Sequence, residues 1–420
     1  PSGPAWKEWM STVPPYVVPK DAQFHEVVVQ TADTVQGSFL TEILVRHAIP
    51  LLMCGNTGTG KTILLKDHLQ NKLEREKYTT IFVNFSAQTS ARVTQSLVDA
   101  SLDKRRKGVY GPPFGKRCVV FVDDLNMPAL EKYGAQPPIE LLRQVLSQGG
   151  FYDLKKLFFK KVQNTAFVAA CGPPGGGRNP LTARLVRHFN LLWVPELAEE
   201  SMQAIFGAIL DGFLKAHPFA AEPAALATPL VAATMAIYGA MKLEMLPTPS
   251  KSHYTFNLRD ISKVVQGMLL ITPPKCEDAD ALLRLWCHET QRVFCDRLVS
   301  TTDRGWFATK MATVLKEKVA KEWAEDDFRS LLFGSYMNAS KGAAVAPYEA
   351  CEMKASQAKF ADYLGDYNLA TTKPMNLVFF SDACAHLARI SRVITQPRGC
   401  ALLVGVGGSG RQSLVRLAAA

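Results

Sequence analysis

A chain of 420 residues is too long for one ordinary hydrophobic core, and we expect roughly two to four domains of about 100–200 residues each. Its 47% hydrophobic and 20% charged residues are typical of a globular protein, and no apolar run reaches the ~18 residues that a membrane span needs. The formal net charge of +10 comes from scattered basic residues, which favours a solvated basic surface over a nucleic-acid groove.

The nine cysteines include no C-x-x-C pair, so a reducing, cytosolic compartment is the expected setting. Cys287, His288 and Cys295 lie on one predicted helix, but their spacing fits no standard zinc site, and no metal is predicted there. The chain begins with Pro1 rather than Met, and we expect it to be part of a longer polypeptide.

The first predicted segment, residues 1–24, is rich in proline and aromatic residues and is typical of an extended connector. A short strand is predicted over 24–29. A helix follows over 35–46, which a threonine or the aspartate of residues 31–34 can cap. The apolar run over 49–53 then predicts the first buried strand.

The stretch after this strand carries the strongest functional signal. Its sequence GNTGTGKT fits the phosphate-loop pattern G-x-x-x-x-G-K-[ST], between the strand and a predicted helix over 63–73. Its glycines let the backbone N–H groups face one anion, and the helix start adds its positive dipole end. Lys61 is expected to reach the β- and γ-phosphates and the Thr62 hydroxyl to bind Mg²⁺; the alternative is a glycine-rich turn without a ligand. The predicted nucleotide-binding residues are Gly55, Asn56, Thr57, Gly58, Thr59, Gly60, Lys61 and Thr62.

Apolar strands continue to alternate with helices as far as residue 195. Further buried strands are predicted over 80–85, 118–122, 164–171 and 190–194, and helices over 91–102, 138–148 and 181–187. Residues 104–115 are predicted to form a basic surface loop and residues 151–161 a small hairpin. This alternation predicts an α/β fold, a parallel sheet with both faces covered by helices.

The strand over 118–122 ends in an acid pair that completes a nucleotide site. Asp123 is expected to hold Mg²⁺ and Asp124 to orient or activate the attacking water; the alternative is an acid pair that caps a helix or turn. ATPases of this class usually have glutamate at the second position, and a carboxylate displaced by about 1 Å can cost on the order of 10²-fold in rate. Gly172 stands where many such ATPases have a polar residue that contacts the γ-phosphate. Both features argue against fast hydrolysis.

Three arginines are candidates to reach a nucleotide. Arg184 and Arg187 lie on the predicted short helix before the fifth strand, where an arginine of a ring ATPase can act on the neighbouring subunit's site. Arg259 lies at the start of a predicted helix and is placed to contact the γ-phosphate. The alternative for each is a surface arginine, free or in a salt bridge.

After Pro195 the pattern becomes helical, with helices predicted over 199–217, 229–245, 258–271, 278–300 and 310–325. Residues 326–375 are weakly patterned, and a new strand-helix pattern begins over 375–392. A buried strand predicted over 401–404 leads into a second phosphate-loop-like sequence, in which Arg411 replaces the usual lysine. The candidate nucleotide-binding residues of this second loop are Gly405, Gly410, Arg411, Gln412 and Ser413.

Together these segments resemble the AAA+ ATPases and, more narrowly, the motor ring of axonemal dynein heavy chains of the inner-arm type. They look like the third AAA+ module followed by the start of the fourth. The segments that carry the resemblance are GNTGTGKT at 55–62, KRRKGVYGPP at 104–113, VFVDDLNMPALEKYGAQPPIELLRQ at 120–144, CGPPGGGRNPLTARLVRHFN at 171–190, FNLRDISKVVQGM at 256–268 and LLVGVGGSGRQS at 402–413.

The resemblance implies an AAA+ P-loop fold and a division of the chain into five parts. These are a connector from the preceding module, a large α/β subdomain, an α-helical lid, an inter-module connector and the start of the next large subdomain. Their expected bounds are 1–24, 25–195, 196–325, 326–374 and 375–420.

The resemblance also implies an ATP-binding regulatory module that contributes to ATP-driven ciliary or flagellar movement, with slow or conditional hydrolysis at its own site. Its expected cofactors are ATP or ADP and Mg²⁺. Arg184 becomes the better candidate to act in trans, on the preceding module's site. Alternatives are a structural ring segment with trapped nucleotide and a nucleic-acid-remodelling ATPase.

The partners implied are neighbouring AAA+ modules of the same heavy chain, a microtubule reached through a stalk outside this chain, and dynein intermediate and light chains. Neither nucleic acid nor membrane is an expected partner. The implied location is the cytoplasm and cytoskeleton, in the axoneme of a cilium or flagellum.

Overall fold

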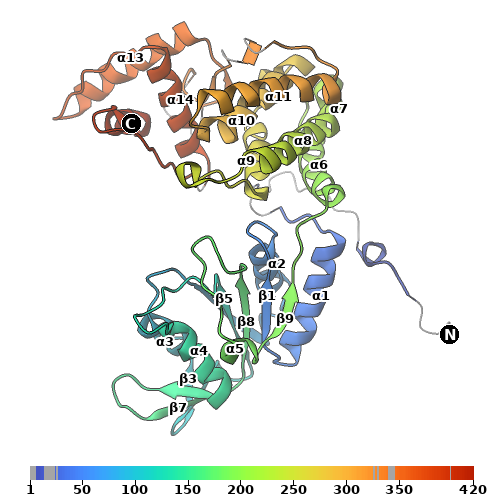
Figure 1. Ribbon diagram of the computed structural model, residues 1–420, viewed down its shortest axis with the longest axis vertical. Helices are drawn as coiled ribbons and strands as arrows, with labels where there is room; N and C mark the ends of the chain where they lie inside the picture. Colours follow the sequence, from blue (N-terminus) through green and yellow to red (C-terminus); the bar gives the residue numbers. More distant parts are fainter. Residues whose placement is uncertain are drawn as a thin grey trace. The chain divides into compact units, whose positions relative to one another are not determined.

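The computed structural model (Figure 1) describes residues 6–13, 24, 27–324, 327–328, 331–338, 346–397 and 399–420. These residues form two compact units. The first includes residues 6–13 and 28–201, and the second includes residues 24 and 27 and the described residues from Met202 onward. Of the connector predicted over 1–24, residues 6–13 and 24 are described, and Trp9–Thr12 form a 3-10 helical turn instead of extended chain. The strand predicted over 24–29 is absent from its described residues, 24 and 27–29.

A parallel sheet is the centre of the first unit, which confirms the predicted fold class. Its strand order is β2-β5-β8-β1-β9, and every neighbouring pair is parallel. The central strands are buried on both faces because their sequences are continuous apolar runs. The strands are β1 (Leu51–Cys54), β2 (Tyr78–Asn84), β5 (Arg117–Asp123), β8 (Thr165–Cys171) and β9 (Asn190–Trp193).

Helices cover both faces of this sheet (Figure 1). Alternate residues of each strand face opposite sides, so Val120 and Val122 pack with the helices α3 and α4, whereas Val119 and Phe121 pack with α1 and α2. The helices are α1 (Ala32–Arg46), α2 (Lys61–Asp67), α3 (Ala91–Asp99), α4 (Pro137–Gln148) and α5 (Ala183–Val186). A π-helical turn, His68–Lys72, extends α2.

Side-chain caps begin two of these helices, and the first is the cap predicted within residues 31–34. Thr31 and Thr34 form a reciprocal capping box at the start of α1, and the Ser90 side chain accepts a hydrogen bond from Val93 N at the start of α3. Each such cap satisfies an N–H group that the helix itself leaves without a partner, and contributes about 1 kcal/mol.

A second, four-stranded sheet corrects the prediction of a surface loop over 104–115. Its order is β3-β4-β7-β6, where the hairpin β6–β7 is the predicted one and β3–β4 was not predicted. The strand β3 is hydrophilic because it is an exposed edge strand, and apolar patterning therefore does not reveal it. The strands are β3 (Asp103–Arg106), β4 (Val109–Gly111), β6 (Gly150–Tyr152) and β7 (Phe159–Val162).

Helices dominate the second unit, as predicted. The last of the lid helices, α11, begins nine residues earlier than the predicted 310, because Ser300 caps it by accepting a hydrogen bond from Asp303 N. The short helix α7 was not predicted. The helices are α6 (Glu199–Ala216), α7 (Ala221–Ala225), α8 (Ala227–Glu244), α9 (Leu258–Met268), α10 (Ala279–Val293) and α11 (Thr301–Val319).

The segment predicted as a weakly patterned connector, 326–374, contains the 18-residue helix α13 (Met353–Ala370) and the small strand pair β10 (Phe333–Gly334) and β11 (Glu349–Ala350). The pattern is weak because only Ser356 and Phe360 of α13 are buried. The helices α14 (Ser381–Thr395) and α15 (Arg411–Ala419) follow.

The strands predicted at the start of 375–392 and over 401–404 are absent. Leu402 and Val404 are 90% and 86% exposed, and in the described part of the chain no strand lies beside them. A strand needs a neighbour to receive its backbone hydrogen bonds, so an apolar run alone does not form one. None of the helices among the described residues is long and apolar enough to cross a membrane.

Candidate functional site

The first phosphate loop connects β1 to α2, and its backbone conformation and close packing explain why it contains glycines. Gly58 and Gly60 have φ values of 88° and 83°, in the left-handed region that favours glycine. At Gly55 the reason is space, since a Cβ there would lie 2.3 Å from the carbonyl oxygen of Val194. The loop can therefore bend tightly before α2 begins at Lys61.

The Lys61 side chain folds over this loop and is nearly buried. Its Nζ donates to the carbonyl oxygens of Gly55 and Asn56, both at 2.7 Å, and to Thr59 Oγ1 at 3.1 Å. Burial is the main cause that lowers the pKa of Lys61, and the nearby Arg178 adds to it. The ammonium group is thus held at the centre of the loop by acceptors that an anion could replace.

The Thr62 hydroxyl and the carboxylate of Asp123 meet, although they lie far apart in the sequence. Thr62 Oγ1 donates to Asp123 Oδ1 over 3.0 Å, because α2 starts beside the end of β5. Burial is the main cause that raises the pKa of Asp123, and the Thr62 hydrogen bond opposes it. Hydroxyl and carboxylate oxygens are the ligands that Mg²⁺ prefers, so this pair fits the predicted metal.

Asp124 adopts an unusual backbone conformation directly after the strand. Its φ of 52° is left-handed for a residue other than glycine, and its N–H donates to Asp123 Oδ1 over 3.1 Å. The residue is exposed. The structure thus places this second carboxylate beside the first, at the same end of the sheet as the phosphate loop.

A buried asparagine that sequence reasoning did not single out supports the end of β8. Asn126 is 1% exposed, and its Nδ2 donates to the carbonyl oxygen of Gly172 over 2.8 Å. The only sequence signal for it was its position two residues after the acid pair. Asn126 therefore ties the segment that follows β5 to the segment that follows β8, and both lie beside the phosphate loop.

The three candidate arginines are exposed in the described structure. Arg184 lies on α5, and Arg187 follows it, with its Nε donating to His188 Nε2 over 3.4 Å. Arg259 lies at the start of α9, where Asn257 and Asp260 form a capping box, and belongs to the second unit. Exposure of these side chains does not test their predicted contacts with a nucleotide, and their roles stay predictions.

The second phosphate loop has a similar backbone in different surroundings. Gly408 and Gly410 are left-handed, with φ values of 78° and 73°, and α15 begins at Arg411. Arg411 Nη2 donates to the carbonyl oxygen of Val406 over 3.0 Å, much as Lys61 bonds to its own loop. Residues 404–410 are all exposed.

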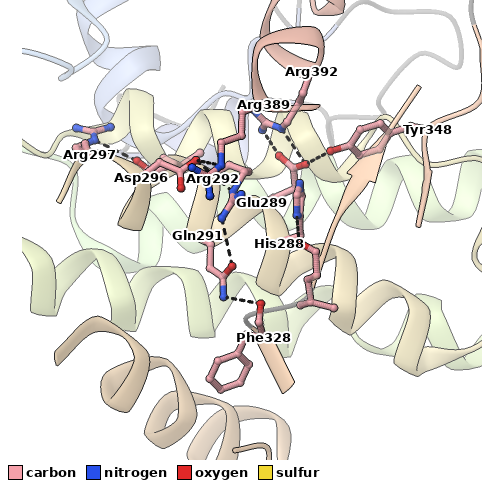
Figure 2. Close-up of polar contacts among 12 residues, drawn as sticks. His288, Glu289, Gln291, Arg292, Asp296, Arg297, Phe328, Tyr348, Arg389 and Arg392 are labelled. Carbon is pink, nitrogen blue, oxygen red and sulfur yellow. Dashed lines mark hydrogen bonds and ion pairs between the residues drawn. The ribbon is translucent and has the colours of Figure 1, made fainter. Parts of the chain in front are cut away.

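A buried polar cluster in the second unit was not predicted either (Figure 2). Glu289 on α10 is fully buried and accepts hydrogen bonds from Tyr348 Oη at 2.6 Å and from Arg392 Nε at 3.0 Å. A Cβ at Gly267 of α9 would overlap the Glu289 carboxylate, so glycine is required there. The cluster joins α9, α10 and α14.

Cys287 and His288, which the sequence places on one helix, are both buried on α10. Burial holds the pKa of His288 well below its ordinary value, and its Nδ1 lies 3.2 Å from the carbonyl oxygen of Leu331. Across the described ranges, no group of three or more His, Cys, Asp or Glu side chains is arranged to hold a metal ion. Cys287 is a buried free cysteine on the same helix.

Comparison with known families matches three parts of the chain to dynein motor models. Residues 16–197 match the P-loop containing dynein motor region, residues 209–304 the ATPase lid domain of the dynein heavy chain, and residues 375–420 the P-loop containing dynein motor region D4.

Curated relatives agree with these matches. The chain is 48% identical to dynein axonemal heavy chain 1 of Homo sapiens, over 99% of the chain and 10% of that protein. It is 44% identical to dynein axonemal heavy chain 12 of Mus musculus, over 95% of the chain and 13% of that protein. It is also 44% identical to dynein axonemal heavy chain 6 of Homo sapiens, over 98% of the chain and 10% of that protein. The chain spans about a tenth of the length of these relatives.

Proposed function

The chain belongs to the dynein heavy-chain motor family, and we propose that it is an ATP-binding regulatory module of an axonemal dynein. In this proposal it is the third AAA+ module of the motor ring together with the start of the fourth. Its large subdomain would span 25–195 and its lid 196–325. An inter-module connector would span 326–374, and the start of the next large subdomain 375–420. The family is one of P-loop nucleotide-binding proteins, which supports ATP or ADP as its ligand.

The observation that carries the proposal is the meeting of Lys61, Thr62 and Asp123 at one end of the sheet. Lys61 and the N–H groups of residues 55–62 would bind the phosphates, while the 3.0 Å pair Thr62–Asp123 would hold Mg²⁺. Bound Mg²⁺ would neutralise phosphate charge. These residues come from α2 and β5, so the folded sheet is needed to assemble them.

We propose slow or conditional hydrolysis at this site. Asp124 would orient the attacking water, but its carboxylate is one methylene shorter than the usual glutamate, and it is exposed. Gly172 offers no side-chain hydrogen bond to the γ-phosphate. Nucleotide would then remain bound for long periods, as suits a regulatory site. Arg259 would reach the γ-phosphate from the lid, and Arg184 would act on the site of the preceding module.

The proposed setting follows the names of the relatives, which are axonemal dynein heavy chains. In that setting the partners are neighbouring AAA+ modules, a microtubule reached through a stalk, and intermediate and light chains. The protein would lie in the cytoskeleton of a cilium or flagellum and contribute to ATP-driven movement.

The substitution Lys61→Ala tests the proposal. It removes the cation at the centre of the loop, and we expect affinity for fluorescent MgATP and MgADP to fall by about 10²-fold or more, because charged hydrogen bonds to phosphate are strong. Lys77→Ala is the matched control, since Lys77 is an exposed lysine of the same unit that pairs with Glu74. Titration of the full chain measures both. Unchanged affinity in the Lys61 variant, with the fold intact, would contradict nucleotide binding at this loop.

A further inference from the structure

The segment after β8 folds back on itself through three glycines. Gly175, Gly176 and Gly177 have φ values of 116°, 58° and 85°, all in the left-handed region. The backbones of Gly175 and Arg178 exchange two hydrogen bonds, of 3.0 and 3.1 Å. This tight turn returns the chain so that Arg178 lies beside the residue at which the segment began, Gly172.

The Arg178 side chain fills the space that a side chain at residue 172 would take. A Cβ built on Gly172 would lie 2.7 Å from both Cδ and Nε of Arg178 and 3.3 Å from its Cζ. Two of these distances are shorter than real Cβ contacts allow. Glycine at 172 and arginine at 178 are therefore matched, because any larger residue at 172 would displace the guanidinium group.

The guanidinium group lies among the elements that form the phosphate site. The strand β8 lies between β5, which ends in Asp123, and β1, which leads into the phosphate loop. Burial is the main cause that lowers the pKa of Lys61, and the positive charge of Arg178 adds to it; burial raises the pKa of Cys171, and the same charge opposes that rise. Arg178 is thus close to the loop and on the side where the strand ends converge.

The guanidinium group also has a donor without a partner. Arg178 Nε is buried and has no hydrogen-bond partner among the described residues. Buried polar groups of folded proteins are almost always paired, because an unpaired one loses the hydrogen bonds it makes in water. A planar guanidinium with a free Nε donor beside a phosphate loop matches the oxygens of a phosphate group.

We infer that Arg178 binds the terminal phosphate of ATP from the space that Gly172 leaves open. The inference rests on the proposed nucleotide site. The inference gives Gly172 a second role, because the absence of a side chain there makes room for the longer, charged side chain of Arg178. A contact to the γ-phosphate exists with ATP and is absent with ADP, so Arg178 is expected to set the preference of this site between the two nucleotides.

The test compares a non-hydrolysable ATP analogue with ADP, each titrated with Mg²⁺ into the full chain. In Arg178→Gln we expect analogue affinity to fall by about 10- to 100-fold, because a charge-assisted hydrogen bond is lost, while ADP affinity stays within about twofold. The matched control is Arg143→Gln, since Arg143 is a half-buried arginine of the same unit that pairs with Glu140. The ratio of analogue affinity to ADP affinity in this variant should equal that of the wild type.

A rescue variant separates binding from a merely structural role. In Gly172→Asn combined with Arg178→Ala, which removes the Cδ and Nε atoms that a Cβ at residue 172 would meet, the asparagine has room and can itself donate to the γ-phosphate, so part of the preference for the ATP analogue should return relative to Arg178→Ala alone. Equal losses for both nucleotides in Arg178→Gln, or an unchanged ratio, would overturn the inference. Arg178→Lys keeps the positive charge but lacks the planar guanidinium, so its ratio of analogue affinity to ADP affinity should lie between those of the wild type and Arg178→Gln. This conservative variant also provides a readout if Arg178→Gln fails to fold.

The outcomes distinguish this inference from the proposed function. If the wild-type chain binds neither nucleotide, both fail. If the wild type binds both nucleotides and Lys61→Ala binds neither, the proposed function holds. An unchanged analogue-to-ADP ratio in Arg178→Gln would then overturn the role of Arg178 alone.

Discussion

The two phosphate loops of this chain have almost the same local conformation and very different surroundings. In each, two glycines are left-handed, a helix begins at the basic residue, and the basic side chain bonds to a carbonyl oxygen of its own loop. The first loop follows a strand paired on both sides, whereas the residues before the second form no strand. The first also has Asp123 beside its hydroxyl residue.

The comparison separates what is local from what depends on the sheet. Glycines and a helix start are sufficient to shape the loop, because they act within about ten residues. The hydroxyl–carboxylate pair Thr62–Asp123 needs β5 and β1 within one sheet, and the Arg178 side chain needs β8 between them. A phosphate-loop sequence therefore predicts a loop, and only the neighbouring strands make it a nucleotide site.

The largest expected difference between the loops lies in the apolar residues before them. Leu52 is 1% exposed in the sheet core, and Leu402 is 90% exposed. We expect Leu52→Ala to reduce the free energy of unfolding by about 2–5 kcal/mol through lost burial and a cavity, and Leu402→Ala to change it by less than about 0.5 kcal/mol. Urea unfolding of the full chain measures both. Similar costs for the two variants would mean that the second loop also rests on a packed strand.

The first glycine of each loop gives the next largest difference. A Cβ at Gly55 would lie 2.3 Å from the carbonyl oxygen of Val194, while the closest atom to a Cβ at Gly405 is Ser409 Oγ at 3.4 Å. Gly55→Ala should therefore reduce the free energy of unfolding by about 1–3 kcal/mol, because the backbone must move to make room. Gly405→Ala should leave the free energy of unfolding nearly unchanged. Thermal unfolding without nucleotide measures the stability of both variants. A tolerated alanine at 55 would show that β9 is not held against the loop.

The sheet and the first loop could be predicted from sequence because each depends on a short, unambiguous signal. The runs over 118–122 and 164–171 are continuously apolar, as strands buried on both faces must be. By contrast, β3 consists of charged residues on an exposed edge, and α13 buries only two side chains, so neither has a recognisable apolar period.

Two features of the site could not be predicted for a different reason. Arg178 lies beside Gly172 only because the turn over 175–177 reverses the chain, and no spacing rule describes that turn. The strand expected over 401–404 has the right composition, yet pairing is a property of two strands. Sequence patterns predict single elements well, and contacts between elements require the fold.

The smallest expected difference concerns the helix that follows each loop. In the helical stretch after the first loop, His68 is 1% exposed and its Nδ1 lies 3.0 Å from Ser38 Oγ, whereas α15 buries only Leu417. Burial, aided by Lys72 and opposed by Glu42 and Asp67, lowers the pKa of His68. Because the pKa of His68 is lower in the folded state than in the unfolded state, folding favours the neutral ring. The stability that the neutral ring contributes is therefore complete above the ordinary histidine pKa and is lost as pH falls below about 6.5.

We therefore expect the melting temperature of the wild-type chain to fall between pH 7.5 and pH 5.5 by more than that of His68→Asn, which has no titrating ring and keeps an amide near the position of Nδ1. The exposed His47 provides the control, since His47→Asn should leave the pH dependence of the wild type unchanged. The quantity compared is the change in melting temperature with pH, which does not depend on the cost of the substitution itself. Parallel curves for His68→Asn and the wild type would show that the core under the first loop carries no titrating group, and would remove this difference between the two loops.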